Sequence, residues 1–360
     1  MKIIFAYLGG PGSCAVYGDK LPLDIYSLPT THMGEASHLM LLHHLREMGH
    51  EIEVLTGCSQ RLDEGFHFPQ VPIAQLPDPE MYDMLLLYKR HGLQLAERFP
   101  LLRHPWKKVC AWFDFGNPQG VLEPGEVDRI SIFWWATQAL LEMAQEKLPA
   151  ASHTLCEYGT LFPSPPSIPE ISEPTGLYAG RLPQVYLDQV LKASEAGPIL
   201  TYALWIMIGE EQILLRPYQL KTGNLDRARA SIPASIHLHS GVNMLNEESA
   251  RCAAYGLVPT AGLRAGGQLL SACKFYDYIA MGLPIVIEEG IPEAKYVKNG
   301  ECLGWTYNWS RPETLGDAVR AALATSLGKN FRESRQHIQD WAFENHTYRH
   351  RAATMHEALS

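Results

Sequence analysis

The sequence predicts a chain of two α/β domains, each built around a mostly parallel sheet. Three observations lead to this fold class. The chain has 360 residues, whereas single α/β domains commonly have roughly 100–200. Its first segment has the pattern of a strand, a loop, a helix and a second strand, which is the repeating unit of doubly wound sheets. A proline-rich connector near the middle then separates two halves with the same kind of pattern.

The first half supplies these elements in order. Residues 3–8 form an apolar run that ends in glycines, which is typical of a buried parallel strand. A helix starts near residue 32 or 34, has leucines at helical spacing on one face, and ends at Gly49. Residues 52–56 form the second strand. We also expect strands at 84–88 and 108–113, a helix at 131–148, and a closing strand at 153–156.

The second half begins after a segment with five prolines at residues 162–174. Prolines make such a segment a stiff, extended connector, so we place the domain boundary there. The two domains are therefore expected at residues 1–170 and 171–340, followed by a terminal segment at 341–360. In the second half we expect a short strand and turn at 176–181, a helix at 185–193, and strands at 199–208, 235–239 and 283–287.

Composition argues against several classes of function. The formal net charge of −9 does not suit a nucleic-acid-binding surface, which needs clustered Lys and Arg. No stretch approaches the ~20 apolar residues of a membrane span. No Lys/Arg run marks a membrane-facing patch, so at most a weak peripheral membrane contact is expected. The seven cysteines are scattered without a C-x-x-C pair, which is typical of reduced thiols in a cytoplasmic protein.

The most informative segment is the string KFYDYIAMGLPIV at residues 274–286. It has the pattern of a helix that ends at Gly282 and leads into a buried strand. Lys274 and Asp277 are three residues apart, so they share one face near the start of this helix. A helix N-terminus favours anions, and a lysine there adds a charge suited to a diphosphate. A carboxylate one turn later can accept hydrogen bonds from a ribose diol. A surface ion pair is the alternative interpretation.

This string resembles the donor-site motif of GT-B glycosyltransferases, and most of all that of the retaining glycosyltransferase family four and its neighbours. Residues 34–56 resemble the first helix and second strand of their N-terminal domain. Residues 178–182 resemble the Gly-Arg turn that opens their donor domain, and residues 341–359 the terminal segment that crosses back to the first domain. The resemblance implies a GT-B fold, with two Rossmann-like domains that face each other across a cleft. The first would bind the acceptor and the second the donor.

The resemblance also implies roles for individual residues. Asp277 would hold the donor ribose. Arg181 and Lys274 would neutralise the diphosphate as it leaves. Gly9 and Gly10 would let the backbone of the first loop approach the phosphates, because glycine removes steric hindrance there.

Two further residues are candidates for the donor, and two positions depart from the family pattern. Ser240 and Gly241 follow a strand of the second half, so their backbone groups are candidates for a nucleobase contact. Retaining enzymes usually have a glutamate eight residues before the ribose carboxylate, where this sequence has Leu269. They usually have a lysine about six residues after the Gly-Arg turn, where it has Leu187. The retaining signature is incomplete, so the stereochemistry stays open.

An inverting enzyme needs a general base near the acceptor, commonly Asp, Glu or His. His32 precedes the first helix, Glu35 lies in its first turn, and Asp114 follows a strand at the carboxyl end, where open α/β sheets bind ligands. Their plainer interpretations are a loop histidine, an acid favoured by the helix dipole, and a turn residue. No metal-ligand spacing lies beside the cations. We interpret His43 and His44 as one interface ring and one exposed ring rather than a metal site.

We therefore expect a cytoplasmic glycosyltransferase that moves a sugar from a UDP- or GDP-sugar to an unidentified acceptor hydroxyl, without a metal or cofactor. One alternative is a non-catalytic GT-B protein that binds a nucleotide sugar. Another is a GT-B sugar-nucleotide epimerase, for which we find no matching catalytic acids. A nicotinamide-dependent oxidoreductase needs a Gly-x-Gly-x-x-Gly turn after a strand, which residues 9–12 do not provide.

Overall fold

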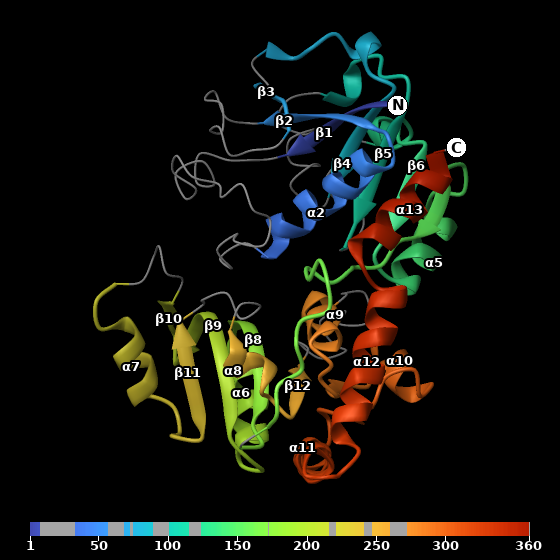
Figure 1. Ribbon diagram of the computed structural model, residues 1–360. Coiled ribbons are helices and arrows are strands. Elements are labelled where there is room, and N and C mark those ends of the chain that lie inside the picture. The colour runs from blue at the N-terminus through green and yellow to red at the C-terminus, as the bar shows by residue number, and fades with distance from the viewer. Residues whose placement is uncertain are drawn as a thin grey trace.

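Two separate sheets form the framework of the protein. The computed structural model describes residues 1–7, 33–56, 68–72, 75–88, 101–114, 124–171, 173–215, 221–240, 247–259 and 272–359. Within these ranges the chain forms two seven-stranded sheets. Figure 1 shows one above the other, with helices packed around each. The predicted fold class, two α/β units with mostly parallel sheets, is confirmed.

The first sheet is parallel throughout and has the strand order β3-β2-β1-β4-β5-β6-β7. Both of its faces are covered. Along β1, Ile3 and Phe5 enter one hydrophobic cluster, whereas Ile4 and Ala6 enter another. Strands buried on both sides have continuous apolar sequences, which explains the pattern of the first half. The strands are β1 Lys2–Tyr7, β2 Glu51–Thr56, β3 Gln70–Pro72, β4 Met84–Tyr88, β5 Val109–Phe113, β6 Ile132–Trp135 and β7 Ser152–Leu155.

The helix predicted at residues 131–148 was wrong in its first part. Residues 132–135 form β6 instead, and helix α5 covers only Gln138–Lys147. Thr137 caps this helix, since its hydroxyl accepts a hydrogen bond from the Leu140 amide at 3.2 Å. Aromatic residues favour strands, which is why this run enters the sheet. All three aromatic side chains of the run are fully buried: Phe133, Trp134 and Trp135.

The second sheet has the order β10-β9-β8-β12-β13-β14, with β11 paired to β9. β9 and β10 form an antiparallel hairpin, and the other described pairs are parallel. β12 and β14 were not predicted, because each has a glycine among its four residues and therefore a weak strand pattern. The strands are β8 Gly176–Leu182, β9 Ile199–Ile208, β10 Glu211–Leu214, β11 Ile236–Ser240, β12 Tyr255–Val258, β13 Ile285–Glu288 and β14 Gly304–Tyr307.

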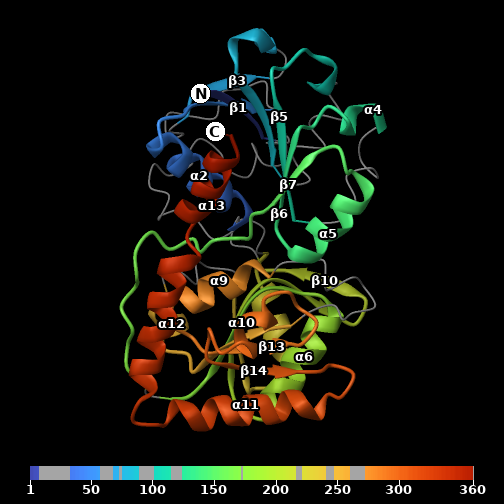
Figure 2. The same ribbon diagram turned by 90° about the vertical axis from the view of Figure 1, so that its right-hand side faces the viewer.

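Helices cover both sheets. Figure 2 shows α12 beside α9 at the level of the second sheet and α13 beside α2 at the level of the first. None of the helices in the described ranges combines the length and apolar character needed to span a bilayer. The α-helices are α2 Met33–Glu47, α4 Pro124–Val127, α5, α6 Gln184–Ser194, α7 Asn224–Ala230, α8 Glu248–Arg251, α9 Cys273–Ala280, α10 Ala294–Lys298, α11 Glu313–Ser326, α12 Phe331–Asn345 and α13 Tyr348–Leu359. Two 3-10 turns, η4 Pro79–Met81 and η5 Leu101–Arg103, complete the described set.

The chain passes between the two sheets twice, at residues 156–162 and 345–351, and we call these paired segments the crossing. The Thr160 amide donates to the carbonyl oxygen of His346 at 2.7 Å, and Thr160 forms a parallel bridge with Thr347. Arg351 Nε donates to the Tyr158 carbonyl oxygen at 2.8 Å. The two passages are therefore joined by a backbone hydrogen bond and by a hydrogen bond from an arginine side chain.

Arg335 of α12 joins this helix to the carboxyl ends of α9 and α8. Its side chain is 1% exposed, and its guanidinium donates to the carbonyl oxygens of Gly282 at 3.1 Å, Met281 at 3.0 Å and Arg251 at 2.7 Å. Burial lowers the pKa of Arg335 to about 10. Gly282 has a φ of +70°, and a Cβ there would lie 2.6 Å from the Arg335 carbonyl oxygen. Glycine therefore permits both the turn after α9 and the approach of α12.

Replacing Arg335 by methionine should destabilise the protein by about 2–4 kcal/mol, because three buried carbonyl oxygens lose their donor. The measurement is the free energy of unfolding in urea. Arg332 lies on the exposed side of the same helix, so Arg332→Met serves as the control and should change stability by less than about 0.5 kcal/mol. Equal stabilities of the two variants would contradict the conclusion that the hydrogen bonds of Arg335 stabilise the fold.

Candidate active site

Arg181 and Lys274, the two cations predicted from the sequence, lie together near the carboxyl end of β8. Lys274 is the second residue of α9. Its Nζ lies 4.3 Å from the centroid of the Tyr178 ring and 5.5 Å from that of Tyr186. Arg181 is exposed and close enough for its charge to lower the pKa of Lys274. Cation–π contacts with the two rings hold the ammonium beside β8.

The electrostatic state of Lys274 suits an anion-binding role. Burial lowers the pKa of Lys274 to about 8. The neighbouring Cys273 acts in the opposite direction, and the charge of Arg181 adds to the lowering. The side chain is only half-buried. An anion placed between the two cations would reverse both unfavourable effects and restore full protonation.

A glycine shapes the strand that carries Arg181. Gly180 has a φ of +134°, and the pairing of β8 with β9 shifts its register between Gly180 and Arg181. A Cβ at Gly180 would lie 3.4 Å from Lys274 Nζ. The Tyr178 hydroxyl donates a hydrogen bond to the carbonyl oxygen of Arg181. Glycine therefore gives the strand its bulge and leaves room for the lysine above it.

Asp277 has different partners from Lys274, although the two share α9. Its side chain is 2% exposed. Oδ1 accepts hydrogen bonds from Thr160 Oγ1 at 3.1 Å and from the Leu161 amide at 2.8 Å. Burial raises the pKa of Asp277 to about 7, while the bonds from Leu161 and Thr160 act in the opposite direction. Lys274 thus reaches β8, whereas Asp277 ties α9 to the crossing. Its predicted contact with a ribose stays a prediction.

An acidic side chain occupies the N-terminus of α9, which sequence reasoning missed. Glu293 Oε1 accepts hydrogen bonds from the Ala272 amide at 3.2 Å and from the Tyr276 hydroxyl at 3.4 Å. Glu293 is 2% exposed. Glu293 already accepts the hydrogen bond of the Ala272 amide at the helix start, so diphosphate binding would depend on the side chains of Lys274 and Arg181. No local pattern connects Glu293 to a helix that begins 20 residues earlier.

Asp114, a candidate general base, lies after the last residue of β5 and faces the crossing. The Tyr158 hydroxyl donates a hydrogen bond to Asp114 Oδ2. The Tyr158 ring packs edge-on against Trp112, with centroids 5.1 Å apart, and lies 6.4 Å from the ring of Tyr276 on α9. Burial raises the pKa of Tyr158, and the charge of Asp114 adds to this effect, so the phenol stays a donor. Asp114 is thereby held on the side of the first sheet that faces α9.

The remaining predicted residues are only partly described. Ser240 ends β11 and is half-buried, with β9 between it and β8. Glu35 lies in the first turn of α2, where only its backbone is described. Leu187 of α6 is 4% exposed and belongs to the core of the second unit, so its side chain lies in apolar packing. Outside the described residues lie Gly9, Gly10, His32, Gly241 and Leu269.

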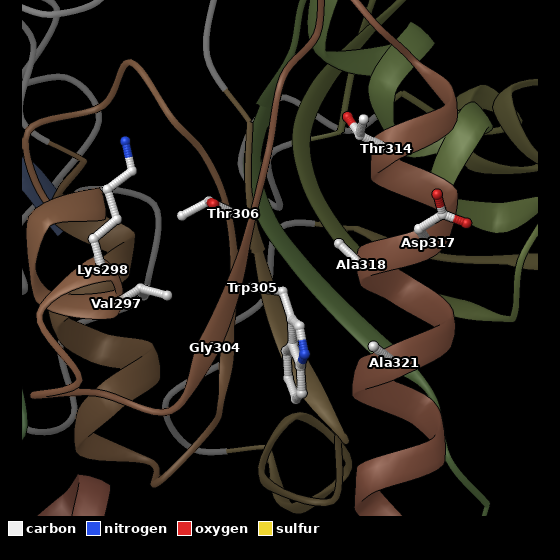
Figure 3. Close-up of a pocket in the computed structure, with 9 residues that line it drawn as sticks. All are labelled: Val297, Lys298, Gly304, Trp305, Thr306, Thr314, Asp317, Ala318 and Ala321. Atoms are coloured by element: carbon white, nitrogen blue, oxygen red, sulfur yellow. The ribbon is translucent and has the colours of Figure 1, made fainter.

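A groove of about 550 Å³ lies elsewhere in the second unit, among α10, β14 and α11. Figure 3 shows Lys298 on one flank, Asp317 on the other and Trp305 between them. β14 is the edge strand farthest from the hairpin. The groove contains none of the predicted site residues, so it is not the candidate active site.

Comparison with known proteins bears on the fold. No protein-family profile and no curated protein matches the sequence. Solved structures do match. They include a glycosyltransferase from Rickettsia africae ESF-5, at 10% identity and TM-score 0.60, covering 99% of this chain and 97% of that one. Sucrose-phosphate synthase from Thermosynechococcus elongatus has 12% identity and TM-score 0.58, with 99% and 98% covered.

A third similar structure is the apo form of the lipopolysaccharide outer core galactosyltransferase WaaB, at 9% identity and TM-score 0.58, with 100% of this chain and 99% of that one covered. Identities this low establish the fold alone. The chain therefore has the GT-B fold, as the sequence predicted.

Asp277→Asn tests the pairing of α9 with the crossing. Asparagine keeps an oxygen for Thr160 and Leu161 but does not ionise. The unfolded aspartate ionises near pH 4 and the folded one near pH 7, so wild-type stability should fall as pH rises through this window and level off above it. The variant should lack this fall and gain a few kcal/mol relative to wild type, as measured by urea unfolding at several pH values. A constant difference between the proteins would contradict the buried, protonated carboxyl.

Proposed function

We propose that this protein transfers a sugar from a nucleoside diphosphate sugar to an acceptor hydroxyl. The observation that carries the proposal is the convergence of Arg181 and Lys274 near the carboxyl end of β8 in a GT-B fold. Open α/β sheets bind nucleotides at the carboxyl ends of their strands. The solved structures named above bear the names of a glycosyltransferase, a sucrose-phosphate synthase and a galactosyltransferase, which supports the same class.

The two cations would act on the leaving group. In the transfer, the bond between the anomeric carbon and the diphosphate oxygen breaks, and its electron pair stays on the diphosphate. A new bond forms from the acceptor oxygen, which loses its proton. Preorganised cations stabilise the charge that develops on the diphosphate. The rings of Tyr178 and Tyr186 hold Lys274 in place before the donor arrives.

We propose Asp114 as the group that accepts the proton of the acceptor hydroxyl, since it follows a strand of the first sheet and Tyr158 orients it. His32 and Glu35 stay candidates for this role from the sequence. In this scheme residues 1–170 hold the acceptor and residues 171–340 hold the donor.

The other donor contacts follow the sequence prediction. Gly9 and Gly10 would approach the phosphates, and Ser240 and Gly241 the nucleobase of a UDP- or GDP-sugar. The crossing uses Oδ1 of Asp277, so a ribose contact would be made by its other oxygen. We propose that the reaction needs no metal ion, because the two cations would neutralise the diphosphate. We also propose that it takes place in the cytoplasm.

A second candidate is a protein that binds a nucleotide sugar without transferring it. The burial of Leu187, at the position where the retaining pattern has a lysine, favours this candidate. The two functions separate in one experiment. UDP, GDP and their sugars are tested by thermal shift, and donor hydrolysis is then measured without an added acceptor. Binding with hydrolysis supports the transferase, and binding alone supports the second candidate. Failure of every nucleotide to bind would remove both.

Lys274→Met should weaken the affinity for the better of UDP and GDP by about 10- to 100-fold at pH 7, because a charge-assisted contact to the diphosphate is lost. Isothermal titration calorimetry measures this change. Lys298→Met is the matched control, since Lys298 is an exposed lysine in the groove beside β14, and it should leave the affinity unchanged.

The pH dependence of nucleotide affinity adds an independent test. In the protein without bound nucleotide, the pKa of Lys274 is about 8. The affinity of the wild type for the nucleotide should therefore fall as pH rises above this value, because the ammonium charge is lost. Lys274→Arg should not show the fall between pH 7 and about 9.5, because arginine stays charged. Parallel curves for wild type and Lys274→Arg would show that another group controls the pH dependence.

A further inference from the structure

Three side chains at the end of α2 form a cluster of metal-ligand type. The ligand atoms of His43, His44 and Glu47 all lie within 4.8 Å of one another. His43 Nε2 is 3.2 Å from Glu47 Oε1, and His44 Nδ1 is 2.8 Å from Glu47 Oε2. Each oxygen of one carboxylate therefore faces one imidazole nitrogen. The helix produces this arrangement, because residues three and four positions apart lie on the same face.

We propose that His43, His44 and Glu47 bind one divalent transition-metal ion, with zinc as the reference case. This replaces the interpretation made from the sequence, one interface ring and one exposed ring, because both imidazoles are partly buried and both face Glu47. Zinc binds imidazole nitrogen at ~2.0–2.1 Å and carboxylate oxygen at ~2.0–2.2 Å, so ligand atoms around a tetrahedral ion lie about 3.3 Å apart. The two nitrogen–oxygen distances in the cluster, 3.2 Å and 2.8 Å, are close to this spacing. Water would complete the shell. Two imidazoles and one carboxylate suit zinc, copper or nickel better than magnesium or calcium, which prefer oxygen ligands.

The cluster is accessible to an ion from solvent. The side chains of His43, His44 and Glu47 are 30%, 17% and 54% exposed, so an ion can reach them without unfolding.

Neighbouring charges set the limits of the affinity. α13 runs beside α2 (Figures 1 and 2). Arg349 of α13 interacts electrostatically with Glu47, and His350 of α13 does so with His44. Arg46 is held over the ring of Phe68, 4.9 Å from its centroid. The positive charges of Arg349 and Arg46 weaken the binding of any cation. The identity of the bound ion would then depend on the preference of the two imidazole nitrogens for transition metals.

The proposed metal site is separate from the candidate active site. α2 ends shortly before β2 begins, so Glu47 lies at the amino-terminal edge of the first sheet. Asp114 follows the carboxyl end of β5 in the same parallel sheet. The ion would thus cross-link two turns of α2 beside α13 and stabilise this region, without contact with the transferred sugar.

The test is calorimetric titration of the full-length protein with zinc sulfate, with magnesium chloride as the comparison. All proteins carry Cys273→Ser, which removes an exposed thiol that competes for zinc. One zinc per chain should bind at this cluster, and His43→Ala and Glu47→Gln should each weaken that binding at least tenfold. The matched control is His337→Ala, an exposed histidine on α12, which should leave zinc affinity unchanged.

Absorption of bound cobalt gives a second reading, since Co²⁺ held by nitrogen and oxygen ligands has visible bands that should disappear in Glu47→Gln. Unchanged zinc affinity in Glu47→Gln would overturn the proposal, as would an equal loss in His337→Ala. Magnesium binding as tight as that of zinc would also overturn it. If His43→Ala fails to fold, Glu47→Gln decides alone, because the Glu47 side chain is exposed.

Discussion

The hydrogen bonds between Asp277 and the crossing are the interaction on which the arrangement of the site depends. The chain passes between the sheets twice, and each passage must satisfy its backbone polar groups away from a sheet. The Thr160 amide donates to the carbonyl oxygen of His346, and the Leu161 amide donates to Oδ1 of Asp277. Because Asp277 belongs to α9, the same contacts fix the position of Lys274 relative to the first unit. The placement of one cation is thereby coupled to the connection between the units.

Each charged or ionisable side chain around α9 contacts a different part of the structure. Lys274 extends to the aromatic rings beside β8, Asp277 to the crossing, and Glu293 to the helix N-terminus. An acid at the helix N-terminus and a second cation on β8 place the strongest attraction for an anion at the side chains, away from the helix backbone. This distribution explains how a buried carboxyl and a cation can lie one turn apart in the sequence and serve different purposes.

Sequence reasoning was most successful where the signal is local. Long apolar runs such as β4, β5 and β9 gave strands close to their observed bounds. The aromatic run in β6 was assigned to a helix because short apolar segments do not distinguish the period of a helix from that of a strand. The strand β12 was missed because a glycine interrupts its four residues. The convergence of Arg181 and Lys274 was predictable because each belongs to a recognisable motif. The contacts of Asp277 and Tyr158 were not, since periodicity gives the face of a helix but not the distant segment that packs on it.

The paired passages at the crossing also determine how the two units can move. Two short segments joined by the bonds of Thr160 connect the units and can serve as an axle, so we expect any relative motion of the units to be a rotation about it that leaves those bonds intact. Displacement grows with distance from the axle. α9 touches it, so Lys274 shifts little, whereas the β9–β10 hairpin lies across the sheet and sweeps a wider arc. A ligand spanning this surface would be clamped most strongly at its outer end and held in nearly constant geometry at its inner end.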